Sequence, residues 1–112
     1  MRHTAETVLA GALDRVKRGW TKGALGRDAD GNLVDAQSRC AVCWCLVGAL
    51  IVTAPRANAA RYAALRLIGQ AIADFGGYSR FCDAMAFNDA SATKRRDVLA
   101  VLRLALKEAR AA

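Results

Sequence analysis

The hydrophobic residues near the start of the chain recur with the period of an α-helix. From Ala5 to Val16 they are spaced three and four residues apart, which is the pattern of one buried helical face. Thr4 precedes the run as a capping residue, and Gly19 follows it as a terminator. We therefore expect a first helix between Thr4 and Gly19. Its buried positions are Ala5, Val8, Leu9, Ala12, Leu13 and Val16.

The stretch Cys40–Val52 has no charged side chain. As a helix it would be about 20 Å long, well short of the roughly 30 Å hydrocarbon layer of a bilayer. Arg39 and Arg56 flank it closely, so no apolar residues extend it. A membrane span is therefore not expected, and we expect no membrane partner.

The same stretch is too long for a typical buried strand, which favours a helix. Ser38 is placed to cap its start, and Pro55 to end it. A helix that is apolar on all sides must be surrounded by other elements. We predict a central core helix at about residues 39–53.

Residues 19–38 are rich in glycine and aspartate, which favour turns. We expect a long loop or a short hairpin there, turning around Ala29–Asn32. The spacing of the aspartates in this segment resembles a calcium-binding loop. The glycine of such a loop is displaced by one position, however, and Arg39 stands where its bidentate glutamate belongs. We expect no calcium site.

Three further helical segments follow. A third helix is expected from Asn58 to about Phe75, a short helical piece at Tyr78–Met85 and a final amphipathic helix at about Thr93–Ala109. The expected inward residues are Tyr62, Leu65, Ile68 (or Gly69) and Ile72, then Phe81, Cys82 and Met85, then Val98, Leu99, Val101, Leu102, Ala105, Leu106 and Ala109.

Composition agrees with helices. The chain has 112 residues, abundant alanine and a single proline, and it is long enough to bury a core without disulfides or metals. The predicted fold class is all-α: one domain over residues 1–112, a compact bundle of four to five helices around the central helix, with the 19–38 segment laid over one end.

The net charge of +7 is spread over the whole chain instead of being gathered in a tail. One ridge is nevertheless expected on the last helix, where basic residues are spaced seven, four and three apart and so share a face. Such a ridge is a candidate phosphate-binding surface. The alternative is an ordinary solvated face, diluted by Asp97 and Glu108. The ridge residues are Arg96, Arg103, Lys107 and Arg110.

No catalytic, metal or cofactor site is expected. Three of the four cysteines lie between Cys40 and Cys45, and on one helix Cys45 would point almost opposite to Cys43. Free cysteine commonly packs as a small hydrophobe. The single histidine, His3, lies at the terminus, and no secretory signal is visible. We expect reduced thiols and a cytoplasmic location.

Several short motifs of the chain resemble those of a family of small bacterial and phage proteins known only as a domain of unknown function. The resemblance spans residues 5–106, and Phe87 stands where the family has a tryptophan. The motifs are Trp-x-x-Gly-Ala (Trp20, Gly23, Ala24), an Asp…Gly turn (Asp28, Gly31), Cys-Leu-x-Gly-Ala (Cys45, Leu46, Gly48, Ala49), an aromatic-Asn-Asp (Phe87, Asn88, Asp89) and Thr-x-x-x-Asp-Val-Leu (Thr93, Asp97, Val98, Leu99).

This resemblance implies an all-helical domain and carries no activity with it. It also implies that five residues form one cluster where the long loop meets the core helix, either as a binding pocket or as a tie that holds the loop; the tie is the favoured interpretation. These residues are Trp20, Asp28, Cys45, Asn88 and Asp89.

Three functional hypotheses follow. The first is a non-enzymatic binding or regulatory protein of the phage or mobile-element type, acting on a cytoplasmic protein partner. The second is a nucleic-acid-binding protein that uses the basic ridge. The third is a small enzyme or metal protein built on the cysteines and on Asn88 and Asp89. The oligomeric state is left open.

Overall fold

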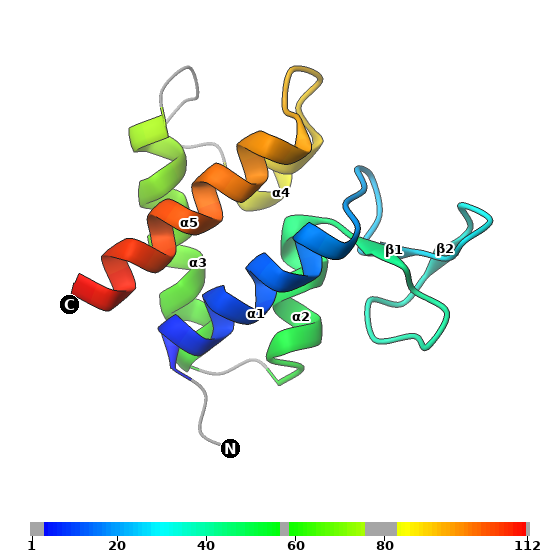
Figure 1. Cartoon of the computed structure of the whole chain (residues 1–112), viewed down its shortest axis with the longest axis horizontal. Coiled ribbons are helices and arrows are strands. Elements are labelled where there is room, and N and C mark those ends of the chain that lie inside the picture. The colour runs from blue at the N-terminus through cyan, green and yellow to red at the C-terminus, as the bar shows by residue number, and fades with distance from the viewer. Residues whose placement is uncertain (1–3, 57–58, 76–82, 112) are drawn as a thin grey trace.

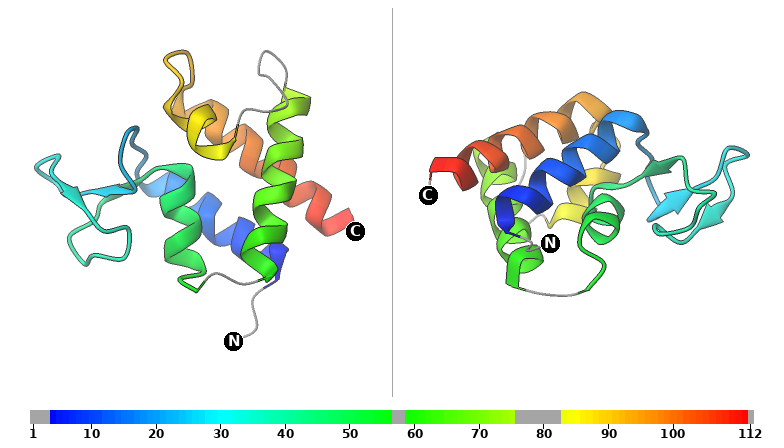
Figure 2. Two further views of the ribbon diagram at one scale, coloured as in Figure 1. Left: turned by 180° about the vertical axis from the view of Figure 1, so that it is seen from behind. Right: turned by 60° about the horizontal axis from the view of Figure 1, so that its bottom comes forward.

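The computed structural model describes residues 4–56, 59–75 and 83–111, which contain five helices and a sheet of three short strands (Figure 1). Helices α1 (Ala5–Arg18) and α5 (Arg95–Ala111) lie side by side in one layer. Helices α2 (Leu46–Thr53), α3 (Ala59–Phe75) and α4 (Ala84–Asp89) lie behind them. The sheet projects from one end of the helical body, as both views in Figure 2 show. It consists of β1 (Gly26–Arg27), β2 (Leu33–Val34) and β3 (Cys43–Trp44).

Helix α1 confirms the prediction made from periodicity. The Thr4 hydroxyl accepts a hydrogen bond from the Thr7 N–H at 3.2 Å, and the Thr7 hydroxyl accepts one from the Thr4 N–H. This reciprocal pair satisfies N–H groups that the helix itself leaves without partners. Gly19 ends the helix, as predicted. Four of its six predicted inward residues are fully buried, namely Val8, Leu9, Ala12 and Val16.

The prediction of a central helix at about residues 39–53 is correct only for its second half. Helix α2 begins at Leu46, so the predicted helix over residues 39–45 is wrong. The Ser38 hydroxyl caps no helix; it accepts the N–H of Cys40 at 3.1 Å within a turn. The helix is capped instead by Cys45, whose Sγ accepts the Gly48 N–H at 3.3 Å. Helix α2 is not enclosed on all sides as predicted: Leu46, Gly48, Ala49 and Leu50 are buried, whereas its other four residues are partly exposed.

Strand pairing explains why the first half of the stretch is not helical. Strand β3 pairs with β1 in antiparallel orientation on one side. On its other side the Trp44 N–H donates to the carbonyl of Gly19 at 3.0 Å, and the Thr21 N–H donates to the carbonyl of Trp44 at 3.2 Å. The backbone groups that a helix would use internally are therefore bonded to two distant segments. Apolarity predicted burial, which is correct for Trp44 and Cys45 but wrong for Cys40 and Val42, which are exposed. It did not indicate the backbone conformation.

The predicted all-α class is therefore wrong in one respect, because the helical body carries an antiparallel sheet of order β2-β1-β3. The alternative of a short hairpin within residues 19–38 is confirmed. Strands β1 and β2 are paired, and the Gly31 N–H donates to the Asp28 carbonyl at the turn. Gly31 has a φ of 85°, which glycine adopts without strain.

The core fills the space between the two helical layers. Helix α5 buries the predicted face, and α3 buries a stripe rotated from the predicted one. Tyr62, expected inside, is 60% exposed, and Ala64 and Ala71 pack inward instead, beside Ile68 and Ile72. Small alanines allow α3 to approach α5 and α1 closely. The buried residues of α5 are Val98, Val101, Leu102, Ala105 and Leu106.

Helix α4 lies later in the chain than the predicted short helix. It covers Ala84–Asp89, while residues 78–82 of the prediction, with Phe81 and Cys82, lie outside the described residues. Met85 was expected to face inward but is 47% exposed. The inward position belongs to Phe87, which is fully buried and packs edge-on against the ring of Phe75. Within the described segments no helix combines the length and apolarity needed to cross a bilayer.

Gly48 sets how closely the 23–26 segment approaches α2. A Cβ at this position would overlap the carbonyl oxygen of Leu25. Glycine therefore allows the loop backbone to lie directly on the helix. This contact positions the loop against α2, where the candidate site is found.

We expect Gly48→Ala to lower the free energy of unfolding by about 1–3 kcal/mol, because the added methyl group displaces the loop backbone. Gly69→Ala is the matched control: Gly69 also lies within a helix, with open space around its missing Cβ. It should raise stability by about 0.5–1 kcal/mol. Urea denaturation of both variants measures the difference, and equal effects would contradict the close approach.

Candidate functional site

A fully buried asparagine, Asn88, joins the loop after α1 to the start of α2. Its Oδ1 accepts the indole N–H of Trp20 at 2.6 Å and the backbone N–H of Leu46 at 3.0 Å. Its Nδ2 donates to the carbonyl of Thr21 at 3.1 Å and to Oδ1 of Asp89 at 2.9 Å. These bonds use the two acceptor and two donor positions of the amide. A buried side chain satisfied in this way fixes the three segments relative to one another.

Two neighbouring side chains extend this connection. Oδ1 of Asp89 also accepts the Gly23 N–H at 3.0 Å. The Lys22 ammonium donates to the Ala90 carbonyl at 2.6 Å and lies 5.6 Å from the centre of the Trp20 ring. The 20–23 segment is therefore bonded to the end of α4 at several points. We call this set the Asn88 network: Trp20, Thr21, Lys22, Gly23, Leu46, Asn88 and Asp89.

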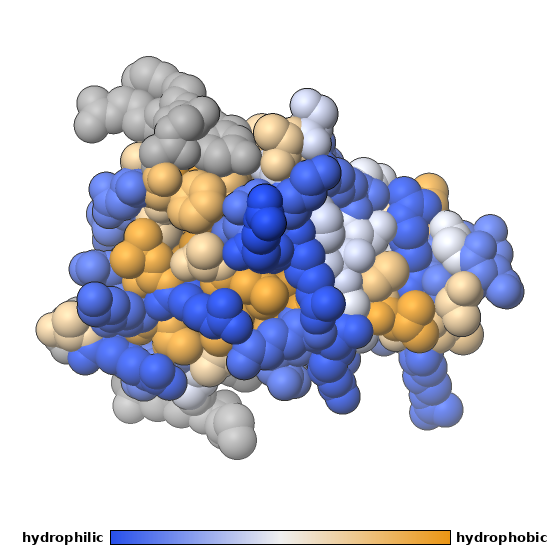
Figure 3. All heavy atoms as spheres, turned by 45° about the horizontal axis from the view of Figure 1, so that its top comes forward, coloured by the Kyte–Doolittle hydropathy of each residue, from blue (hydrophilic) through white to orange (hydrophobic). Residues whose placement is uncertain are grey.

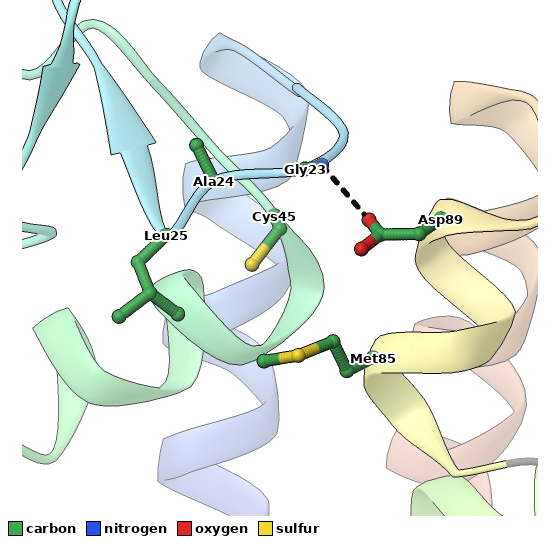
Figure 4. Close-up of a pocket in the computed structure, with 6 residues that line it drawn as sticks. All are labelled: Gly23, Ala24, Leu25, Cys45, Met85 and Asp89. Carbon is green, nitrogen blue, oxygen red and sulfur yellow. Dashed lines mark hydrogen bonds between the residues drawn. The ribbon is translucent and has the colours of Figure 1, made fainter.

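A pocket of about 210 Å³ opens beside the network (Figure 4). The Asp89 carboxylate stands at one side of it, with one oxygen bonded to Gly23 and the other toward the pocket. The Cys45 and Met85 side chains point toward one another across it. Its walls are mostly apolar, and among the described residues its single charged group is Asp89. The lining residues are Gly23, Ala24, Leu25, Cys45, Met85 and Asp89.

Burial raises the pKa of the Cys45 thiol above its ordinary value, and the Asp89 carboxylate raises it further. The backbone N–H of Gly48 acts in the opposite direction but does not overcome the loss of solvent. The thiol is therefore neutral at physiological pH. It gives the pocket an uncharged, polarisable floor, and it lacks the thiolate character that a nucleophile requires.

The predicted cluster is brought together except for Asp28. Trp20, Cys45, Asn88 and Asp89 all belong to the Asn88 network or to the adjoining pocket. Asp28 lies instead at the hairpin turn, where its Oδ1 accepts the N–H groups of Asp30 and Asn32 at 3.0 and 2.9 Å. The Asp28 carboxylate thus accepts the backbone N–H groups of its own turn, and this local role accounts for its place in the family motif.

The ridge residues of α5 are all exposed, but they are not equally available. The Arg110 guanidinium pairs with the Glu6 carboxylate at 3.0 Å, which leaves Arg96, Arg103 and Lys107. In Figure 3 hydrophilic side chains form separate clusters on this side of the molecule, with apolar surface between them.

Several residues of the site were not predicted. Lys22 occupies a variable position of the Trp20–Ala24 motif, and nothing in its local sequence indicates that its ammonium bonds the carbonyls of Ala90 and Ser91. Leu25 was treated as part of a loop, although it lines the pocket. Met85 was placed in the core by a periodicity that extended the short helix too early. Each depends on contacts between segments more than sixty residues apart, as the Gly23–Asp89 bond illustrates.

The described residues contain no group of three or more histidine, cysteine, aspartate or glutamate side chains arranged to hold a metal ion. Cys40, Cys43 and Cys45 are free thiols. His3 and Cys82, the further ligands that a zinc site would need, lie outside the described residues.

Comparison with family models gives a match over residues 1–108 to a family of unknown function, DUF6197. The chain belongs to this family. The match confirms the resemblance to an uncharacterised domain family, since it spans nearly the whole chain. Neither a curated protein nor a solved structure matches the chain significantly. Membership in DUF6197 names no activity, so functional inference rests on the geometry of the site.

Asn88→Asp tests the donor side of the network. The introduced carboxylate faces the carbonyl of Thr21 and the carboxylate of Asp89 at neutral pH, whereas the protonated form can donate an O–H. Burial raises the pKa of the introduced group above its unfolded value of about 4, so stability relative to the parent is lost as the pH rises from that value to the raised pKa of the folded protein. We expect a loss of about 2 kcal/mol or more at pH 7 and a smaller loss at pH 4.

Urea denaturation at both pH values measures this difference, with the pH dependence of the parent subtracted. Asn32→Asp is the control, because Asn32 is exposed in the hairpin turn. A loss of equal size at pH 4 and pH 7 for Asn88→Asp would contradict the assigned donor bonds.

Thiol reactivity tests the assignment of Cys45. In the folded protein at pH 8 we expect iodoacetamide to alkylate the exposed Cys40 at least about tenfold faster than Cys45, which is buried and resists ionisation. In urea the two rates should become similar. Peptide mapping by mass spectrometry gives both rates, and rapid labelling of folded Cys45 would show that its thiol is accessible and ionised.

Proposed function

We propose that this protein is a non-enzymatic binding protein that acts on a protein partner through a concave apolar surface around Leu25. Three hollows share this residue: the pocket described above, one of about 390 Å³ and one of about 370 Å³. Leu25 is 38% exposed at their junction. We call this area the Leu25 surface: Leu25, Leu33, Val34, Ile51 and Met85.

Exposure of apolar side chains is the observation that carries the proposal. Leu33 is 69% exposed and Met85 47%, and both adjoin hollows that contain Leu25. Exposed large apolar residues gathered around a concavity are typical of interaction sites. Apolar surface is also visible in Figure 3 at the end of the molecule formed by the sheet. Edge strand β2 adds backbone groups that a partner segment can pair with.

Charge at the Leu25 surface supports a protein partner over a nucleic acid. Asp35 lines two of the hollows and Asp89 the third, and no basic side chain is among the described residues that line them. Arg27, the nearby cation of the hairpin, donates to Thr21 Oγ1 and to the carbonyls of Gly31 and Lys22. Carboxylates repel phosphates and attract basic side chains. The cytoplasmic, phage or mobile-element setting expected from the sequence remains part of this proposal.

Affinity capture with matched variants tests it. Capture from cells that encode the protein should recover a partner with the parent chain, and Leu33→Asp should reduce recovery at least about tenfold by placing a charge in the apolar contact. Tyr62→Asp is the control, because Tyr62 is similarly exposed at 60% but lies on α3. Equal recovery with both variants would contradict binding at the Leu25 surface.

Nucleic-acid binding is the second candidate, favoured by one observation. Lys94, Arg95 and Arg96 border an open hollow of about 450 Å³ at the start of α5, next to the exposed ridge. If the capture recovers nucleic acid and Arg103→Glu with Lys107→Glu abolishes that recovery, this candidate replaces the first. The enzyme or metal hypothesis gains no support from Cys45, whose thiol is buried and neutral.

A further inference from the structure

The pocket beside Asp89 has features that specify its ligand more narrowly than an apolar contact does. It is bounded by Leu25 and Met85 and floored by the neutral Cys45 thiol, and Asp89 is the one charged group among its described lining residues. An occupant must therefore present an apolar stem to the walls and a positive charge to the rim. Lysine and arginine side chains have this form.

The hydrogen bonds of Asp89 distinguish between the two. Its Oδ1 already accepts the N–H of Gly23 and the Nδ2–H of Asn88. Among the described residues Oδ2 accepts no hydrogen bond, and Figure 4 shows it turned toward the pocket. A guanidinium binds a carboxylate best through both oxygens, whereas an ammonium is a point charge that one oxygen can serve. A single available oxygen favours lysine.

Among the described residues, no cationic side chain forms an ion pair with the Asp89 carboxylate. Lys22 is close in sequence to Gly23, but its ammonium donates to the carbonyls of Ala90 and Ser91. The one ion pair found in the described part of the chain joins Arg110 to Glu6. Asp89 therefore stands beside an apolar cavity with its charge directed at an empty volume.

We propose that this pocket binds a lysine side chain of the protein partner, with the aliphatic stem between Leu25 and Met85 and the ammonium on Asp89 Oδ2. This inference rests on the proposed function and specifies the residue that the partner inserts. Lysine is favoured over norleucine by the ion pair and over glutamate by the sign of the charge. The site is formed by three segments: residues 23–25, the start of α2 and α4.

The methyl group of Met85 is a local reporter for the test. The chain has two methionines, so ¹³C-methyl labelling gives two signals, and Met85→Leu assigns one of them. The probes are lysine methylamide acetylated on its α-nitrogen, which keeps the side-chain ammonium free, and the norleucine analogue, which has no charge. We expect the lysine probe to shift the Met85 signal and to bind about two- to fivefold more tightly than the norleucine probe, the range of a partly exposed ion pair.

Asp89→Asn should reduce this ratio to about one. Asparagine keeps an acceptor oxygen for Gly23 and Asn88 and loses only the charge at the pocket, so the network is retained. Asp35→Asn is the matched control, since Asp35 is a carboxylate of the Leu25 surface that does not line this pocket, and it should keep the parental ratio. In the parent, 0.5 M salt should weaken the lysine probe and leave the norleucine probe unchanged.

An unmoved Met85 signal at saturating lysine probe overturns the proposal. A preference for lysine that persists in Asp89→Asn also overturns it. So does a preference that salt fails to weaken in the parent protein, and this salt test does not depend on any variant folding. If the Leu33→Asp variant loses partner capture while the lysine preference is absent, the lysine site fails and protein binding stands. If the pocket prefers lysine over norleucine but Leu33→Asp does not affect capture of the partner, the proposed binding surface is contradicted and the lysine site is retained.

Discussion

The amide of Asn88 is the group on which the described part of the molecule depends most. It lies without solvent contact and bonds the loop after α1, the first turn of α2 and the end of α4. A buried amide whose hydrogen bonds are all made costs little free energy. If one partner is missing, the cost is a substantial share of the free energy of unfolding of a small domain. The three segments therefore adopt one arrangement together, and the pocket walls are by-products of that arrangement.

The helices could be predicted because their signals are local. Thr4 and Gly19 bound α1, and the apolar face of α5 is regular enough to be identified by spacing alone. The sheet could not be predicted, because strands of two residues have no periodicity to detect. The pairing of Trp44 with Gly19 and with β1 joins segments that are distant in sequence. Long-range backbone bonds overrode the apolar run that favoured a helix over residues 39–45.

The candidate site was likewise predicted only in part from the sequence. Motif resemblance brought Trp20, Cys45, Asn88 and Asp89 together correctly, and it included Asp28, which serves its own turn. The favoured interpretation of the cluster as a tie for the loop agrees with the bonds of Asn88. The pocket was the other interpretation of the cluster, but its apolar walls at Leu25 and Met85 could not be predicted, because these residues were assigned to a loop and to the core. The cluster both holds the loop and borders a pocket. The hydrogen bond from Gly23 to Asp89 Oδ1 holds the loop, and the other carboxylate oxygen of Asp89 faces the pocket.

The walls of the pocket are contributed by residues 23–25 and by α4, which are separated by some sixty positions, as the Gly23–Asp89 bond of sequence separation 66 shows. A chain emerging from the ribosome would present Leu25 and Cys45 long before Met85 and Asp89 exist. The complete pocket therefore forms only after α4 has been synthesised. It also requires the 20–23 segment to have closed onto α4, as in the Gly23–Asp89 bond.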